Sequence, residues 1–242
     1  MDSVSTLSRI KAVSFDLDDT FWDCAPVIKK AEQALSAWLH DQHPDVMALH
    51  SVESLRNRRL AMYESHAHLA CDVTEMRKAF LRSLFTTPGM EYRAEIHETH
   101  VEQAFAVFYR ARSEVVLYEG TRELLDTLSP THKLAAITNG NADLELIGLD
   151  AYFDDIQSAS LKKPPKPAAD MFQSCCRNLD VNPSELLHVG DNPETDIVGG
   201  HNANVHTVWF NQFSADWPAE LPRPHFEVSS LPELQQLLGG SA

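Results

Sequence analysis

The chain has 242 residues, of which 43% are hydrophobic and 23% charged, a composition that excludes a disordered protein. Its formal net charge of −15 argues against nucleic acid and anionic membranes as partners. It contains no apolar stretch of the roughly 18 residues that a membrane span needs, and no apolar signal region at its start. With four cysteines that form no CxxC pair, these features predict a cytoplasmic protein with reduced thiols.

The first predicted element is a short apolar strand over residues 12–15, which runs directly into an acidic segment. From about residue 22 to 113 the apolar spacing is helical, and no good strand pattern occurs. Pro26 suits a helix start, and Asp72 with Glu75 resembles a capping box. This segment is therefore expected to consist of helices.

From residue 114 onward, strand and helix patterns alternate. Strands are predicted at 134–137, 156–158, 186–189 and 205–210, and a final strand before the last helix. Helices are predicted at 121–128, 166–179, 196–202 and 231–238. Short apolar strands alternating with helices predict a parallel sheet covered on both faces.

We therefore expect an α/β protein with a Rossmann-like, doubly wound parallel-sheet core and an inserted all-helical cap domain. The core comprises residues 1–20 and 114–242, and the cap residues 21–113. Because the cap leaves the core after the first strand, we expect it over the carboxyl ends of the strands, where open α/β sheets bind ligands. The cap carries 11 basic and 12 acidic residues and the core 9 and 23, so an anion site in the core requires a metal ion and placed cations.

Four polar clusters fall at predicted strand ends or helix starts. They are Asp16 with Asp18, Thr138 with Asn139, Lys166, and Asp191 with Asn192 and Asp196. Each cluster alone is typical of a turn, a helix cap or a solvated loop. The carboxyl ends of parallel strands meet at one edge, however, so the four together predict a single site.

Phosphoryl transfer through an aspartyl phosphate fits this set of residues, because a carboxylate can attack phosphorus and water can then hydrolyse the intermediate. Mg²⁺ held by Asp16 and Asp191 would neutralise the meeting anions. Thr138 and nearby N–H groups can hold phosphate oxygens, while Lys166 balances charge in the transition state. Asp18, two residues beyond the nucleophile, suits general acid/base catalysis.

The sequence resembles the haloacid dehalogenase (HAD) superfamily of phosphohydrolases. The segments that match its four motifs, in the family's order, are FDLDDT (15–20), ITNGN (137–141), KPAADMF (166–172) and HVGDNPETD (188–196). The resemblance implies a Rossmann-like core with a helical cap inserted after the first motif. It also implies that Asp16 is the nucleophile and Asp18 the acid/base, with Thr138, Asn139 and Lys166 on the phosphate.

The same resemblance implies that Mg²⁺ is bound by Asp16, the Asp18 main-chain carbonyl and Asp191, with Asp196 supporting the metal site. The third motif reads LKKPPKPAADMF, in which Lys163 is the alternative to Lys166. Lys166 has the family's spacing to the final Phe of the motif and directly precedes the predicted helix.

The sequences of these motifs are similar to those of bacterial flavin mononucleotide phosphatases, which also act on the phosphorylated ribitylamino-uracil intermediate of riboflavin synthesis. The resemblance therefore implies a phosphatase for a small-molecule phosphomonoester. We expect the protein to be a monomer or a homodimer. Two alternatives remain. One is a 2-haloacid dehalogenase of the same superfamily, which needs neither Asp18 nor a metal. The other is a non-enzymatic phospho-accepting signalling module, which lacks a cap and orders its residues differently.

Overall fold

The computed structural model describes residues 6–86 and 94–239, and the chain forms two compact units. The first unit draws on residues 1–23, 116–140 and 148–242, and the second on residues 24–115 and 141–147. The helical unit thus begins and ends two or three residues later than the sequence patterns indicate. It also takes up the short segment that follows the second motif.

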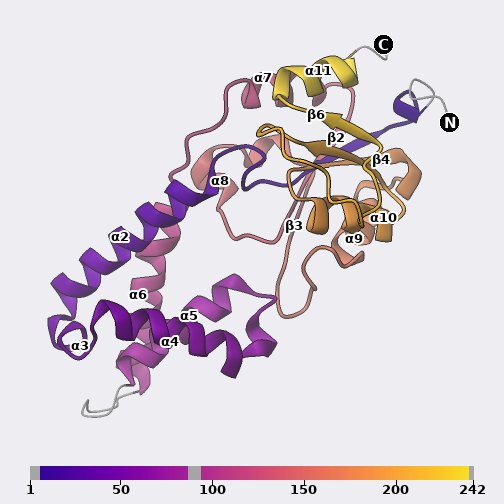
Figure 1. The fold of residues 1–242 in the computed structure, drawn as a ribbon. Helices are drawn as coiled ribbons and strands as arrows, with labels where there is room; N and C mark the ends of the chain where they lie inside the picture. The colour runs from indigo at the N-terminus through magenta and orange to yellow at the C-terminus, as the bar shows by residue number, and fades with distance from the viewer. Residues whose placement is uncertain (1–5, 87–93, 240–242) are drawn as a thin grey trace. The chain divides into compact units, whose positions relative to one another are not determined.

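A six-stranded sheet with the strand order β3-β2-β1-β4-β5-β6 forms the centre of the first unit (Figure 1). The strands are β1 (Ala12–Phe15), β2 (Lys133–Thr138), β3 (Asp155–Ser158), β4 (Leu186–Gly190), β5 (His206–Phe210) and β6 (Phe226–Val228). Every neighbouring pair is parallel. The chain moves outward from β1 through β2 and β3, then returns to the other side of β1 with β4. This reversal makes the carboxyl ends beside β1 the expected ligand site.

Helices cover both faces of the sheet, which confirms the expected doubly wound core. They are α7 (Thr121–Leu128), α9 (Asp170–Leu179), α10 (Val198–Asn202) and α11 (Leu231–Gly239), with the short turns η2 (Asp150–Tyr152), η3 (Pro183–Glu185) and η4 (Pro193–Ile197). In Figure 1, α7 and α11 lie on one side of the sheet and α9 and α10 on the other. All residues of β1 and β4 are buried, as a sheet covered on both faces requires.

Among its described residues the second unit contains helices and turns but no strand, which confirms the expectation of an all-helical insertion. It contains α2 (Cys24–Gln42), α3 (Pro44–Ala48), α4 (Val52–Ser65), η1 (Ala67–Leu69), α5 (Val73–Phe85), α6 (Ala94–Arg112) and α8 (Leu144–Ile147). Every fourth residue of α2 from Val27 to Leu39 is buried or nearly so, giving the helix one apolar face. The Asp72 side chain caps α5 by accepting from the N–H groups of Thr74 and Glu75.

No helix within residues 6–86 and 94–239 has both the length and the apolar character that crossing a membrane would require.

Candidate active site

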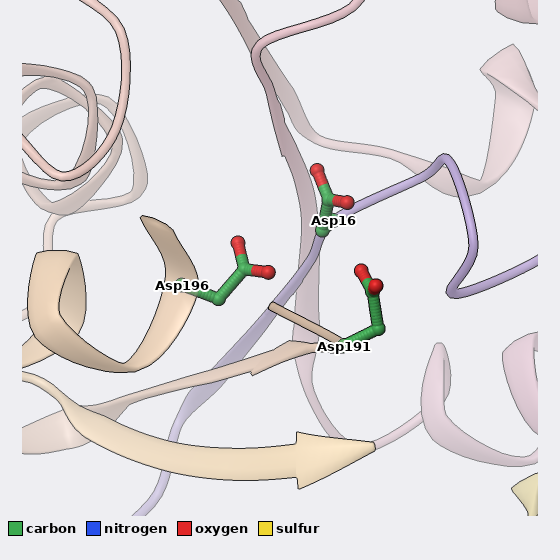
Figure 2. Close-up of side chains that lie close together, drawn as sticks. All are labelled: Asp16, Asp191 and Asp196. Carbon is green, nitrogen blue, oxygen red and sulfur yellow. The ribbon is translucent and has the colours of Figure 1, made fainter. Parts of the chain in front are cut away.

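The carboxylates of Asp16, Asp191 and Asp196 come together at the carboxyl ends of β1 and β4 (Figure 2). Asp16 follows the last residue of β1, and its N–H donates to the Val189 carbonyl at 2.8 Å. Asp191 follows β4, and Asp196 lies in the π-helical turn η4. One oxygen of each carboxylate lies within 4.8 Å of the other two, an arrangement suited to a shared cation.

Lys166 neutralises part of this acidic cluster. Its ammonium donates to Asp16 Oδ1 and to Asp196 Oδ1, each at 2.6 Å, and to the Ile137 carbonyl at 2.7 Å. An ammonium has three N–H groups, so these three acceptors satisfy all of them. Lys166 is only 3% exposed, and a charge buried to this degree is tolerated only when it is paired in this way.

Burial and like charge set the proton affinities of the three acids. Burial raises the pKa of Asp16 well above its ordinary value; Lys166 opposes this rise and Asp196 adds to it. Burial, reinforced by the charge of Asp196, raises the pKa of Asp191 to about 7. Burial also acts to raise the pKa of Asp196, but Lys166 and the hydrogen bond to His188 outweigh it and hold that pKa at about 2. Lys166 and Asp196 therefore form the stable ion pair, and Asp16 and Asp191 need a further cation to ionise together.

A tight turn after β1 fixes Asp18. Trp22 Nε1 donates to Asp18 Oδ1 at 2.8 Å, and the Asp19 N–H donates to the Trp22 carbonyl at 2.8 Å. Asp19 has a left-handed backbone with φ of 59°, which Asp adopts more readily than most residues. Phe21 and Trp22 are fully buried, and the Phe21 ring lies 5.1 Å from that of Phe15. Sequence analysis missed the role of Trp22 because its bond to Asp18 depends on this turn.

Thr138 and Asn139 lie at the end of β2. Thr138 is the last residue of the strand, and its hydroxyl accepts from the Gly140 N–H at 2.9 Å. The Asn139 side chain holds the Lys166 backbone: its Nδ2 donates to the Lys166 carbonyl at 3.0 Å, and its Oδ1 accepts from the Lys166 N–H at 2.8 Å. The Asn139 side chain thus positions the loop that carries Lys166, while its expected contact with phosphate stays a prediction.

The expectation that Lys166 directly precedes a helix is wrong, because α9 begins only at Asp170. Both backbone polar groups of Lys166 are bonded to the Asn139 side chain, which keeps this residue in a loop. The peptide bond between Lys166 and Pro167 is cis. Lys163, the alternative phosphate lysine, donates from its ammonium to the Gln157 side chain, whereas Lys166 reaches the acids.

The helix predicted from Asp196 begins earlier, at Pro193. Asn192 caps it by accepting from the N–H groups of Glu194 and Thr195, and Asn followed by Pro is a recognisable helix start. The earlier start places Asp196 inside the turn η4, with none of its surface exposed.

A buried histidine lies behind the acids. His188 Nε2 lies 3.1 Å from Asp196 Oδ1, and His188 Nδ1 lies 2.9 Å from Ser14 Oγ on the neighbouring strand β1. Ser14 and His188 are both fully buried. Burial lowers the pKa of His188 from its ordinary value, so its ring is neutral at pH 7. Sequence analysis gave neither residue a role, although a histidine within a strand buried on both faces is itself a signal.

The donor set fits a hard divalent cation such as Mg²⁺. Three ionised carboxylates and one ammonium carry two net negative charges, which a divalent ion would balance. Asp196 is already engaged: Lys166 and His188 contact its Oδ1, and the Asn192 N–H donates to its Oδ2 at 3.0 Å. The carboxylates of Asp16 and Asp191 are therefore better placed to bind the ion, with Asp196 in support.

Comparison with known proteins gives consistent matches over nearly the whole chain. A family model described as a haloacid dehalogenase-like hydrolase matches residues 10–204, a range that includes every residue of the site. The chain is 33% identical to the 5-amino-6-(5-phospho-D-ribitylamino)uracil phosphatase YigB of Escherichia coli (strain K12), over 96% of this chain and 98% of that protein. It is 29% identical to the N-acylneuraminate-9-phosphatase of Rattus norvegicus, with 96% and 95% of the two chains covered.

A solved structure shows the same fold. The 2-haloacid dehalogenase from Pseudomonas syringae pv. Tomato DC3000 superposes with a TM-score of 0.88 at 33% identity. The match covers 96% of this chain and 100% of the dehalogenase chain.

Gly190 lies against Asp196, so a side chain at this position would disturb the site. A Cβ at this position would lie 2.3 Å from Asp196 Cγ, and Asp196 cannot easily move because Lys166 and the Asn192 N–H hold it. We predict that Gly190→Ala lowers kcat about 10- to 100-fold, in the range typical of residues that orient a metal site. Steady-state kinetics on the folded variant measure this.

The matched control is Gly239→Ala, where an added Cβ meets no atom within 4 Å. This variant should keep the activity of the parent. Equal activity in the two variants would show that Asp196 can shift without consequence.

Proposed function

Because the chain belongs to the haloacid dehalogenase-like hydrolase family and is a phosphoric monoester hydrolase within it, we propose that it hydrolyses a small-molecule phosphomonoester through an aspartyl phosphate on Asp16. The observation that carries this proposal is the contact of buried Lys166 with both Asp16 and Asp196, beside Asp191. One cation there is fixed within the protein, and the surplus negative charge calls for a second that arrives as a metal ion.

In the first step, a carboxylate oxygen of Asp16 attacks phosphorus and the bond from phosphorus to the ester oxygen breaks. Asp18 protonates the departing alkoxide, for which its position two residues beyond the nucleophile is suitable. Trp22 Nε1 holds one oxygen of Asp18, so the acid is oriented before substrate arrives. Thr138 contacts a phosphoryl oxygen, and the ammonium of Lys166, bonded to Asp16, balances the negative charge of the phosphoryl group.

In the second step, Asp18 accepts a proton from water, and the water oxygen attacks the phosphorus of the aspartyl phosphate. The bond between phosphorus and Asp16 breaks, releasing inorganic phosphate and restoring the carboxylate. Mg²⁺ would be held by the carboxylates of Asp16 and Asp191 and by the Asp18 main-chain carbonyl, and supplies the positive charge that lets two anions meet.

For the substrate, we propose a ribityl phosphate attached to a heteroaromatic ring. Similarity to the ribitylamino-uracil phosphatase over nearly the whole of both chains supports this class. Flavin mononucleotide shares the ribityl phosphate group and is the second member of the class. The phosphate would occupy the acidic site, so preference within the class depends on groups that contact the rest of the molecule.

A 2-haloacid dehalogenase is the second candidate, favoured by the structural similarity to a protein of that description. That reaction needs a carboxylate nucleophile but neither a metal nor an acid two residues further along the chain. The oriented Asp18 and the paired acids Asp16 and Asp191 therefore support the phosphatase.

The nucleophile is tested with Asp16→Asn. An amide does not attack phosphorus as a carboxylate does, so turnover of a phosphomonoester should fall by at least about 10³-fold while the protein stays folded. Phosphate release and circular dichroism measure the two quantities. Asp155→Asn on β3 is the matched control and should remain active; a folded Asp16→Asn variant with substantial turnover would contradict the assignment.

Metal removal is tested with EDTA. Chelation should abolish phosphate release, because Asp16 and Asp191 cannot ionise together without a cation, and added Mg²⁺ should restore it. A halide-release assay with a 2-haloacid runs in parallel. Full phosphatase activity in metal-free enzyme would refute the metal requirement, and halide release would support the dehalogenase instead.

Substrate class is tested by competition at fixed Mg²⁺ and pH. The kcat/KM for the phosphorylated ribitylamino-uracil and for flavin mononucleotide should exceed that for ribose 5-phosphate, which has a similar charge but no ring. N-acylneuraminate 9-phosphate is included because a relative acts on it. If ribose 5-phosphate or the neuraminate is preferred, the riboflavin-related assignment fails while the phosphatase assignment stands.

A further inference from the structure

A chain of buried hydrogen bonds runs behind the nucleophile. Ser14 Oγ lies 2.9 Å from His188 Nδ1, and His188 Nε2 lies 3.1 Å from Asp196 Oδ1. Lys166 donates to that same Asp196 oxygen and to Asp16 Oδ1, both at 2.6 Å. All five residues are buried, so water does not compete for these bonds.

The chemistry of the partners fixes the direction of each bond. An ionised carboxylate only accepts, so His188 Nε2 carries the hydrogen that reaches Asp196. In a neutral ring the other nitrogen then has a free lone pair, and the Ser14 hydroxyl donates to it. Asp196 therefore selects the tautomer of His188 that carries hydrogen on Nε2, and the Ser14 hydroxyl satisfies the other ring nitrogen.

Three donors from different parts of the chain orient the carboxylate of Asp196. Lys166 and His188 contact Oδ1, and the Asn192 N–H donates to Oδ2 at 3.0 Å. Lys166 has no spare N–H group, because its third bond goes to the Ile137 carbonyl. A rotation of the Asp196 carboxylate would therefore pull the ammonium away from Asp16.

We infer that His188 is a positioning residue for the hydrolysis: with its second ring nitrogen bonded to Ser14, it holds Asp196 so that Lys166 stays on the nucleophile Asp16. This inference rests on the proposed role of Asp16. His188 lies behind Asp196 and is proposed to contact neither substrate nor metal. It acts only through Asp196, as residues behind metal and nucleophile sites do in general.

Packing alone does not account for a histidine here. The rings of His188 and Phe172 form a T-shaped pair with a centroid distance of 4.9 Å and an interplanar angle of 89°, a contact that an apolar side chain could also make. Burying a polar ring in a covered strand costs free energy unless both nitrogens are bonded. Both are bonded, and one of the bonds leads to the acid that holds the catalytic lysine.

The test compares two substitutions of His188. His188→Leu fills the space without a donor, and kcat for a phosphomonoester should fall about 10- to 100-fold with little change in KM. His188→Gln keeps an N–H near the position of Nε2 and should recover kcat to within about fivefold of the parent. The Mg²⁺ concentration for half-maximal activity should rise in the Leu variant and recover in the Gln variant.

Leu187→Ala is the matched control. Leu187 is the adjacent residue of β4 and fully buried, and its side chain points to the opposite face of the sheet. It should lose stability but keep kcat and the Mg²⁺ response. Equal losses in His188→Leu and His188→Gln, or wild-type kcat in folded His188→Leu, would overturn the inference.

Two further measurements decide the matter even if His188→Leu does not fold. Nitrogen-15 NMR of histidine-labelled protein should show His188 with hydrogen on Nε2, and Ser14→Ala should keep that tautomer, because Asp196 still accepts this hydrogen. Hydrogen on Nδ1 in the unaltered protein would contradict the inference. Asp16→Asn is assayed in parallel: if it stays active, the proposed function fails, whereas if it is inactive and the His188 series is unaffected, only this inference fails.

Discussion

The site depends on one buried ammonium that two carboxylates share. Lys166 lies between Asp16 and Asp196, and without it these acids would be like charges confined within the protein. Four segments hold Lys166. The Ile137 carbonyl belongs to β2, Asn139 follows β2, Asp16 follows β1, and Asp196 lies in the turn η4. The sheet supplies these positions because its order reverses beside β1.

The fold was largely predictable because its determinants are local. Buried strands are short apolar runs, and the helices have apolar residues spaced by about 3.6 positions. Both patterns can be recognised in the sequence without knowledge of tertiary contacts. The convergence of Asp16 and Asp191 was likewise predictable, since each directly follows a strand, β1 and β4, and the carboxyl ends of parallel strands meet at one edge. In the structure Asp16, Asp191 and Asp196 lie together. Asp196 also bonds directly to Lys166, a contact that its position in the sequence did not indicate.

What the sequence could not supply depends on contacts between distant residues. The start of α9 lies beyond Lys166 because Asn139, 27 residues earlier, bonds its backbone. Asp18 is oriented through a turn with a left-handed Asp19, a conformation that sequence spacing does not reveal. His188 and Ser14 lie 174 residues apart, and only the pairing of β4 with β1 brings them into contact.

The site also explains how one core serves relatives with different reactions. A carboxylate beside a buried lysine suits attack on carbon as well as on phosphorus, which is consistent with likeness to a dehalogenase and to two phosphatases. Phosphoester hydrolysis makes two further demands: a proton for the alkoxide and a cation for the phosphate. In the proposed mechanism Asp18, bonded to the buried Trp22, supplies the proton, and Asp191, whose pKa burial raises to about 7, helps to bind the cation. In this proposal Asp18 and Asp191 are the residues specific to phosphoester hydrolysis, whereas the pair of Asp16 and Lys166 suits both reactions.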